Sequence, residues 1–333
     1  MRAAPRSPRA AKAPIVDRRV RRAWQGLGAF SRIVRVTTSA ESWTVRRLLE
    51  WTTGFFTRKN VDPPRLSAEL LLSHVLGVPR IKLYTDYDRE LEPGQLGQYR
   101  ALVKRASEDE PIAYLTGRAH FFNLEFEVTR DVLIPRPDTE TLVENVLQLA
   151  RITAGLEAPR VLDLCTGSGC VAAAIAHHLK RAIVHATEKS AAAAEVARRN
   201  VERLGLGDRV HVEVGDLFEP IARLVDAQPF DLIVANPPYI ASDQIARLDR
   251  SVREYEPIEA LDGGVDGLQI HRRILAEAPQ RLMPGGRIFL EIAFDQGAAA
   301  LEMIRAHDAF EEPRVLRDHA GKDRVLAARK RAS

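Results

Sequence analysis

The tetrapeptide Asn236-Pro237-Pro238-Tyr239 combines side chains that could do chemistry with a backbone of restricted shape. It follows the short apolar run Phe230–Ala235, which predicts a buried strand. Neither proline can donate a backbone hydrogen bond, and each restricts the residue before it, so the turn has a fixed shape rich in acceptors. An amide side chain at the start and an aromatic ring at the end suit the binding of an NH2 group, such as a carboxamide or the exocyclic amine of a base.

A second candidate site is the glycine-rich turn Cys165-Thr166-Gly167-Ser168-Gly169, which follows the apolar run Val161–Leu164. The two glycines allow positive φ and a close approach of backbone to ligand. The helix expected after the turn offers free N–H groups and a positive dipole end. Glu188, nineteen residues after Gly169 at the end of the next strand, could accept both hydroxyls of a ribose. Together these features predict an adenosine-type cofactor.

Two other interpretations of the glycine-rich turn stay open, an NAD site and a tight strand-to-helix turn without a ligand. The third glycine of a dinucleotide motif is missing, which counts against NAD. Asp216, after the third strand, could accept from an adenine amino group or could be a surface turn residue. If it contacts adenine, Leu217 would pack on the ring. No metal site is predicted.

The elements that must position these residues alternate between strand and helix from residue 160 onward. The expected strands are 160–164, 183–187, 210–214, 230–235 and 287–292, with helices over 169–179 and 191–204 among the connections. This alternation predicts an α/β fold with a doubly wound, mainly parallel sheet. Ligands of such sheets bind at the carboxyl ends of the strands, where both candidate turns lie.

Before residue 137, the spacing of apolar residues does not show the alternation of strand and helix. Residues 41–115 predict three helices, the first capped by Ser42 and the others preceded by Pro63-Pro64 and Pro93-Gly94, and so a small bundle. The segment 116–136 predicts a linking β-hairpin in which 124–128 alternates, 129–131 turns and 132–134 runs back. A helix over 139–150 then opens the sheet domain, which is expected to span 137–330.

The composition of the chain limits the classes of protein to which it can belong. The chain has 333 residues, 45% of them apolar, which is ordinary for a globular protein of two domains. No apolar run approaches the ~18 residues that a membrane span needs. Cys165 and Cys170, the only cysteines, lie in one motif, so a disulfide framework is not expected and a reducing compartment is.

Charge is unevenly distributed along the chain. Residues 1–40 hold nine arginines and one lysine against one acid, so with a total of +4 the remaining residues sum to −5. A mildly acidic body argues against a nucleic-acid-binding domain. The basic segment 1–40 predicts either a disordered extension or an organellar transit peptide. We therefore expect a cytoplasmic protein, or a mitochondrial matrix protein if the segment is a transit peptide.

Several motifs together resemble the class I S-adenosylmethionine-dependent methyltransferases and, among them, the release-factor glutamine methyltransferases of the HemK/PrmC family. The resemblance covers roughly residues 41–330 and implies that the sheet has seven strands. Beside Asn-Pro-Pro-Tyr, it rests on the segments Arg65–Leu72, Pro111–Gly117, Leu133–Glu140, Glu291–Gln296 and Asp318–Val325. The first residue of the glycine-rich turn, Cys165, is familiar from the branch that methylates a glutamine of ribosomal protein L3. That branch, however, usually has Pro-Arg-Ser-Pro where this chain has Pro135-Arg136-Pro137-Asp138.

The resemblance implies transfer of a methyl group from S-adenosyl-L-methionine to the N5 amide nitrogen of the Gly-Gly-Gln glutamine of class 1 release factors. The Asn236 oxygen and the Pro237 carbonyl would accept the two amide hydrogens, while Tyr239 would pack on the carboxamide beside Pro238. Phe121 would be a second wall, unless it is a core residue. The cofactor site would comprise Asn236 and, from the residues described above, Cys165, Thr166, Gly167, Ser168, Gly169, Glu188, Asp216 and Leu217. The proton would leave late, to water. Arg136, Asp138, Glu140, Glu291 and Gln296 would be structural.

The resemblance also implies a monomer without a membrane partner or a direct nucleic-acid substrate. Four alternatives stay open. The target could be ribosomal protein L3, or an exocyclic amine of DNA or RNA, for which the acidic body lacks a basic recognition surface. A dehydrogenase and a non-catalytic module that binds release factors are the other two. A non-catalytic module would be expected to lack one of Gly167, Gly169, Glu188 and Asn236, and all four are present.

Overall fold

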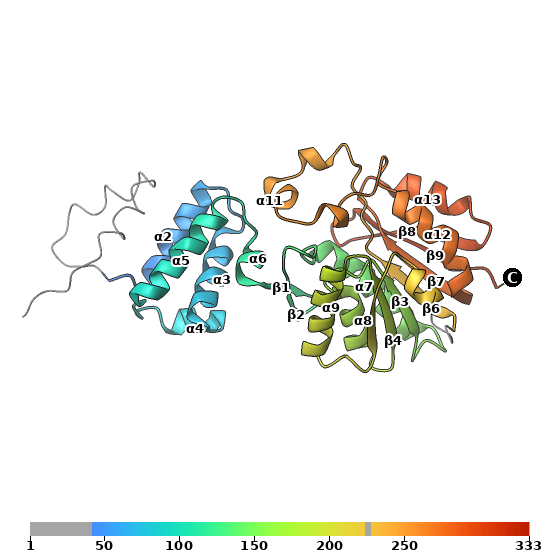
Figure 1. Cartoon of the computed structure of the whole chain (residues 1–333), viewed down its shortest axis with the longest axis horizontal. Coiled ribbons are helices and arrows are strands. Elements are labelled where there is room, and N and C mark those ends of the chain that lie inside the picture. The colour runs from blue at the N-terminus through green and yellow to red at the C-terminus, as the bar shows by residue number, and fades with distance from the viewer. Residues whose placement is uncertain (1–41, 224–227, 333) are drawn as a thin grey trace, which may run out of the picture.

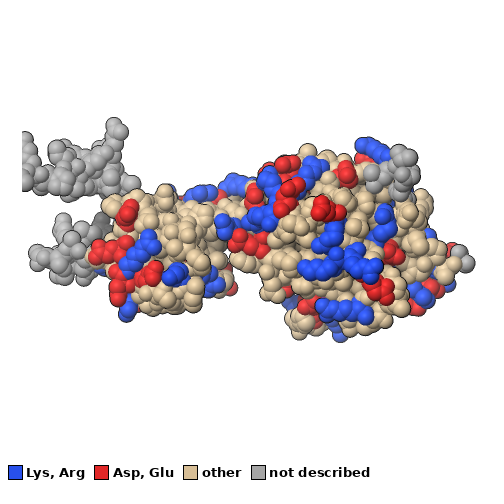
Figure 2. All heavy atoms as spheres, turned by 90° about the horizontal axis from the view of Figure 1, so that it is seen from below, with Lys and Arg blue, Asp and Glu red and all other residues tan. Residues whose placement is uncertain are grey.

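The computed structural model describes residues 42–223 and 228–332, which form a helical part and a larger α/β part (Figure 1). The predictions for residues 1–40 lie outside the described residues. Within the described residues, none of the helices combines the length and the apolar character needed to cross a membrane. On the face shown in Figure 2, acidic and basic side chains are interspersed on both parts.

The helical part has its own core. Its helices are α2 (Val45–Arg58), α3 (Pro64–Leu76), α4 (Arg80–Thr85), α5 (Pro93–Ala106) and α6 (Ile112–Thr116). Leu49, Leu71 and Tyr99 lie fully or almost fully buried between the three long helices, as expected for a bundle. The short helices α4 and α6 were not predicted, because six and five residues are too few to show a helical period.

The predicted cap of the first helix is wrong. Thr44, not Ser42, caps α2, and its hydroxyl accepts from Arg47 N at 3.4 Å. Thr44 pairs with Glu90 in an antiparallel bridge, and the Trp43 carbonyl accepts from Leu91 N, so the chain is still extended there.

The predicted pairing of the hairpin is also wrong. Strands β1 (Arg118–Phe121) and β2 (Leu124–Glu127) pair with each other, and Phe122 and Asn123 form the turn. Both turn residues have positive φ, 49° and 61°, which is the conformation of a tight two-residue hairpin turn. Residues 132–134 do not return as a strand, because Val132 packs in a small cluster and Ile134 N donates to Glu256.

The α/β part is built on one seven-stranded sheet with the order β5-β4-β3-β6-β7-β9-β8. Its strands are β3 (Arg160–Leu164), β4 (Ile183–Glu188), β5 (Val210–Val214), β6 (Phe230–Ala235), β7 (Leu282–Glu291), β8 (Phe310–Arg317) and β9 (Asp323–Lys330). The first five are parallel, whereas β9 is antiparallel to both of its neighbours. The predicted doubly wound, mainly parallel sheet is confirmed.

Helices cover both faces of this sheet (Figure 1). On one face pack α7 (Glu140–Ile152), α8 (Cys170–His178) and α9 (Ala191–Arg203), and on the other α10 (Glu219–Ala222), α12 (Gln269–Arg281) and α13 (Gly297–Arg305). Each strand residue faces one core or the other, so Val161 joins the first cluster and Leu162 the second. The remaining short elements are η2 (Pro137–Thr139), η3 (Ile245–Arg247), α11 (Arg250–Arg253) and η4 (Ile258–Ala260).

Contacts of Arg130, Tyr255 and Arg250 join the helical part to the α/β part. Arg130 Nη2 pairs with Glu110 Oε1 at 2.6 Å, and the Arg130 guanidinium lies over the Tyr255 ring. The Tyr255 hydroxyl donates to the Glu108 carbonyl at 3.2 Å, and Arg250 pairs with Asp109 at 3.4 Å. The segment that follows the Asn-Pro-Pro-Tyr turn is therefore held directly against the helical part.

Candidate active site

A cavity of about 710 Å³ lies at the carboxyl edge of the parallel strands. Of the predicted site residues, it is lined by Cys165, Thr166, Gly167, Ser168, Glu188, Asp216, Leu217, Asn236 and Pro238. The two candidate turns, about 70 residues apart in sequence, thus meet at one site because β3 and β6 are neighbours in the sheet. The volume is in the usual range of ligand-binding pockets, roughly 300–1,000 Å³.

The glycine-rich turn between β3 and α8 has three residues with positive φ: Cys165 at 57°, Gly167 at 54° and Gly169 at 78°. A side chain at Gly169 would be strained in this conformation, and its Cβ would lie 3.2 Å from Ala197 Cβ in α9. The glycine therefore allows α8 and α9 to pack closely below the turn.

Asp163 holds the glycine-rich turn and was missed by the sequence analysis. Its Oδ2 accepts from Thr166 Oγ1 at 2.6 Å and from Ala172 N at 3.2 Å, which joins the two sides of the turn. Burial raises the pKa of Asp163 to about 7, although these two hydrogen bonds oppose the rise. The signal in the sequence was a single carboxylate inside an otherwise apolar strand.

Glu188 lies at the end of β4, as predicted, with its carboxylate toward the glycine-rich turn. Oε2 accepts from Gly167 N at 2.9 Å and Oε1 from Ser190 N at 2.9 Å. These two bonds fix the carboxylate, and each oxygen keeps a further lone pair for a ligand hydroxyl.

Asp216 and Leu217 follow β5 and lie on the wall of the cavity. Asp216 Oδ2 pairs with Arg273 Nη2 at 2.8 Å, and Arg273, from α12, lines the same cavity. Leu217 is 5% exposed and has a φ of 50°, so its side chain is fixed at the surface of the core. A ligand that hydrogen-bonds Asp216 would share this carboxylate with Arg273.

Asn236, at the end of β6, is oriented by a contact with the segment before α7. Its Nδ2 donates to Thr139 Oγ1 at 3.1 Å, so its Oδ1 is left as the acceptor. Two glycines allow the loop after the turn to fold back onto it. A Cβ at Gly263 would lie 2.7 Å from the Pro238 carbonyl oxygen, and one at Gly267 would lie 2.2 Å from that of Tyr239.

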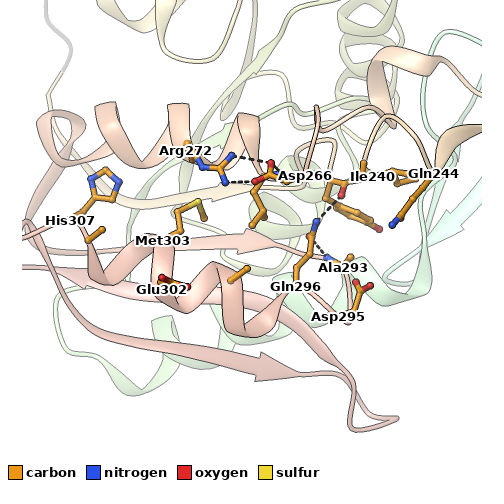
Figure 3. A pocket seen from close by; sticks show the side chains of 15 residues that line it. Ile240, Gln244, Asp266, Arg272, Ala293, Asp295, Gln296, Glu302, Met303 and His307 are labelled. Atoms are coloured by element: carbon orange, nitrogen blue, oxygen red, sulfur yellow. Dashed lines mark hydrogen bonds and ion pairs between the residues drawn. The ribbon is translucent and has the colours of Figure 1, made fainter.

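Gln296 supports the same turn from below. Its Nε2 donates to the Tyr239 carbonyl at 2.9 Å, and its Oε1 accepts from Ala293 N at 2.9 Å (Figure 3). This agrees with the structural role predicted for Gln296.

Two predicted substrate contacts are placed elsewhere. Tyr239 lines a second cavity, of about 680 Å³, together with Arg272, Gln296 and Met303 (Figure 3), and its hydroxyl donates to Glu291 at 3.4 Å. Phe121 is 1% exposed and packs against Phe126 in the core, which corresponds to the alternative of a packing residue. Neither ring is part of the wall of the first cavity, and the same holds for Pro237 and Gly169.

The Pro-Arg-Pro-Asp segment is a clamp, as predicted. Arg136 pairs with the buried Glu256, whose other oxygen accepts from Ile134 N at 3.4 Å. Asp138 pairs with Arg324 of β9 at 2.9 Å. The Glu140 carboxylate accepts from the Phe122 amide at 2.8 Å and ties the hairpin turn to α7.

Comparisons with known proteins find relatives over most of the chain. The family model described as PrmC N-terminal domain matches residues 47–117, and that described as methyltransferase small domain matches residues 138–250. A protein of Geobacter sulfurreducens named release factor glutamine methyltransferase is 43% identical over 294 residues, which are 88% of this chain and 99% of that protein. A protein of the same name from Rhodopirellula baltica is 40% identical, again over 88% of this chain and 99% of that protein. Among solved structures, a methyltransferase from Pyrococcus furiosus is 22% identical, with a TM-score of 0.45 over 70% of this chain and 98% of that one.

Proposed function

The chain belongs to the family of release factor glutamine methyltransferases, and we propose that it methylates the glutamine of the Gly-Gly-Gln motif in class 1 peptide chain release factors. Its α/β part has the fold of class I S-adenosylmethionine-dependent methyltransferases, and S-adenosyl-L-methionine is its methyl donor. The observation that carries the proposal is the meeting of the glycine-rich turn, Glu188 and the Asn236 amide in one cavity.

The residues of the cavity fit the donor. Gly167 lines the cavity without a side chain, and a Cβ there would stand in open space, while Glu188 offers acceptor lone pairs for a ribose. Asp216 and Leu217 would contact the adenine. Bound S-adenosylmethionine supplies an electrophilic methyl group on a sulfonium.

The chain's own contribution is to orient a poor nucleophile. The lone pair of a glutamine amide nitrogen is delocalised into the carbonyl group, so the nitrogen attacks well only when it is aligned and its hydrogens are bound. Asn236 Oδ1 and the Pro237 carbonyl are proposed to accept these two hydrogens, while Pro238 bounds the site. As the N–C bond forms and the S–C bond breaks, positive charge develops on the nitrogen and both acceptors stabilise it. The nitrogen then loses one proton, to water in this proposal.

We also propose that different segments of the chain have different roles. Residues 41–115 would recognise the release factor, 116–136 would link the two parts and 137–330 would carry the reaction. The relatives named above are bacterial, which supports a cytoplasmic reaction. We also propose that the protein acts as a monomer.

The test is mass spectrometry of a release factor incubated with the enzyme and S-adenosylmethionine. One methyl group on the Gly-Gly-Gln glutamine is expected, and none on a release factor with alanine at that position. Parallel incubations with ribosomal protein L3 and with nucleic acid identify the alternative substrates. Methylation of either of these, with none of the release factor, would contradict the proposal.

Asn236→Ala gives the matched catalytic test. The variant should keep most of its affinity for S-adenosylmethionine in calorimetry but lose on the order of 10²–10³-fold in kcat, as when a preorganised group of an active site is removed. Turnover close to that of the wild type would refute the role of the Asn236 oxygen.

A further inference from the structure

A buried carboxylate, Glu291, lies behind the Asn-Pro-Pro-Tyr turn and takes no part in the reaction as proposed. It ends β7 inside an apolar run, and none of its residue surface is exposed. Its Oε2 has no hydrogen-bond partner among the described residues. A buried carboxylate costs stability unless its partners compensate, so its hydrogen bonds are informative.

Glu291 lies beside groups that contact both ends of the tetrapeptide. At one end, Asn236 Nδ2 donates to Thr139 Oγ1 at 3.1 Å, and the Thr139 hydroxyl lies close enough to the Glu291 carboxylate to lower its pKa. At the other end, the Tyr239 hydroxyl donates to Glu291 Oε1 at 3.4 Å. Gln296 holds the Tyr239 backbone at the same time (Figure 3).

The charge on Glu291 decides which way the Asn236 amide faces. An ionised carboxylate attracts the Thr139 hydroxyl proton and can donate none, so the Thr139 oxygen is left to accept from Asn236 Nδ2. The Asn236 oxygen then remains for the hydrogens of the substrate amide. If Glu291 were protonated, it could donate to Thr139, and Thr139 could donate to Asn236. The amide would then turn its NH2 group toward the substrate NH2 group, and two donors would face each other.

We propose that Thr139 and Glu291 are positioning residues that fix the Asn236 side-chain amide with its oxygen toward the substrate. This inference rests on the proposed function and deepens it. Thr139 is 2% exposed and Glu291 fully buried, so neither group exchanges its partner for bulk water.

The surroundings of Glu291 make its charge sensitive to pH near neutrality. Burial raises its pKa to about 7, and Asp138 adds to the rise, whereas Thr139, Arg324 and Tyr239 oppose it. Arg324 itself is shared with Asp138 and Asp318. The other titratable groups that face Glu291 are His271 of α12, which contacts its backbone oxygen, and Cys170 of α8. Because only the ionised carboxylate fixes the productive amide, kcat should fall as the pH is lowered through 7.

The experiment compares steady-state methylation of a release factor by full-length wild type, Thr139→Val, Thr139→Ser and Glu291→Gln. Thr139→Val keeps the shape and removes the hydroxyl, so kcat should fall by on the order of 10²-fold from the loss of alignment. The affinity for S-adenosylmethionine should stay unchanged in calorimetry. Thr139→Ser keeps the hydroxyl and should stay within about threefold of the wild type on the same argument. Thr141→Val, a buried threonine of α7 outside the cavity, is the matched control and should retain wild-type kcat.

Glu291→Gln supplies a measurement that a purely structural role would not change. Its amide oxygen can still accept from Thr139, but it has no charge to lose, so the fall in kcat below pH 7 should disappear. Equal kcat for Thr139→Val and wild type, equal damage from Thr139→Ser and Thr139→Val, or an unchanged pH profile in Glu291→Gln would overturn the inference. Absence of methylation by the wild type would instead refute the proposed function, and the inference with it.

Discussion

Replacing Arg136 with alanine should leave the buried carboxylate of Glu256 without its ion-pair partner beside the active-site cavity. Glu256 is 5% exposed, and its carboxylate is held by Arg136 and by a 3.4 Å hydrogen bond from Ile134 N. The residues that follow it, Pro257–Ala260, line the cavity. Removing one partner of a buried ion pair typically costs 3–5 kcal/mol. We expect the lower end here, about 3 kcal/mol at pH 8, because Arg136 is one third exposed and the Ile134 bond remains.

The pH dependence of this loss follows from the pKa of Glu256. Burial already raises that pKa above 4.5 in the wild type, although Arg136 opposes the rise, and loss of Arg136 raises it further. A raised pKa gives stability that is fully present below the unfolded-state pKa and is lost as pH rises through the folded-state pKa. The deficit of Arg136→Ala should therefore be small near pH 5 and grow toward pH 8. Each pH unit over which only the folded chain keeps the proton contributes about 1.4 kcal/mol.

Urea unfolding followed by circular dichroism at pH 5 and pH 8 measures both effects. The double variant Arg136→Ala/Glu256→Gln also removes the unpaired charge of residue 256. It should regain most of the free energy of unfolding, and its remaining loss should not depend on pH. Arg253→Ala removes an exposed pair with Glu254 and an exposed hydrogen bond to the Ala246 carbonyl, so it is the matched control and should change little. An Arg136→Ala deficit that is equal at the two pH values, or a double variant as unstable as the single one, would refute this reasoning.

The remaining predictions concern the donor half of the cavity. Glu188→Ala should weaken S-adenosylmethionine binding at least tenfold in calorimetry, because a hydrogen bond to a charged group contributes about 1.5–3 kcal/mol and the Gly167 turn loses its anchor. Unchanged affinity would exclude Glu188 from the site. Gly169→Ala should destabilise the protein by about 1–2 kcal/mol, since a Cβ at positive φ is strained and would lie 3.2 Å from Ala197 Cβ. Gly94→Ala, where a Cβ meets no atom within 4 Å and φ is not in the strained region, is its control, and equal melting temperatures would contradict the strain argument.

Local sequence patterns predicted the central strands because these strands are buried on both faces. The segment 160–164 is apolar at three of its five positions and 230–235 at five of its six, and the observed strands have the same bounds. Strands β8 and β9 escaped prediction. β8 carries Glu311, Glu312 and Arg314 at the edge of the sheet, so it shows neither an apolar run nor a strict alternation. The hairpin pairing failed because its turn depends on positive φ at Phe122, a residue type for which that conformation is unusual.

The candidate site was predictable to the extent that it follows from strand order. Four of the predicted features each end or follow a parallel strand: the glycine-rich turn, Glu188, Asp216 and Asn236. Neighbouring parallel strands bring such ends together at one edge of the sheet. The contacts that orient these groups were not predictable in the same way. Thr139 is 97 residues from Asn236, and Tyr239 is 52 residues from Glu291, so no local period connects them. The only signals were single acids, Asp163 and Glu291, inside apolar strands.

The Asn-Pro-Pro-Tyr turn alone does not show whether the methyl acceptor is a carboxamide or the exocyclic amine of a base, since both present a planar NH2 group. The choice has to come from the surface through which the substrate reaches Asn236, and the helical part is fixed beside that surface. The arginines at this junction already have carboxylate partners: Arg105 and Arg130 bind Glu110, and Arg250 binds Asp109. Hydrogen bonds from both arginines lower the pKa of Glu110 despite its burial, so it stays ionised near neutral pH. A nucleic acid would have to break these pairs before its phosphates could bind the same guanidinium groups. A protein substrate needs no such exchange, and this favours the amide of a protein as the group that Asn236 receives.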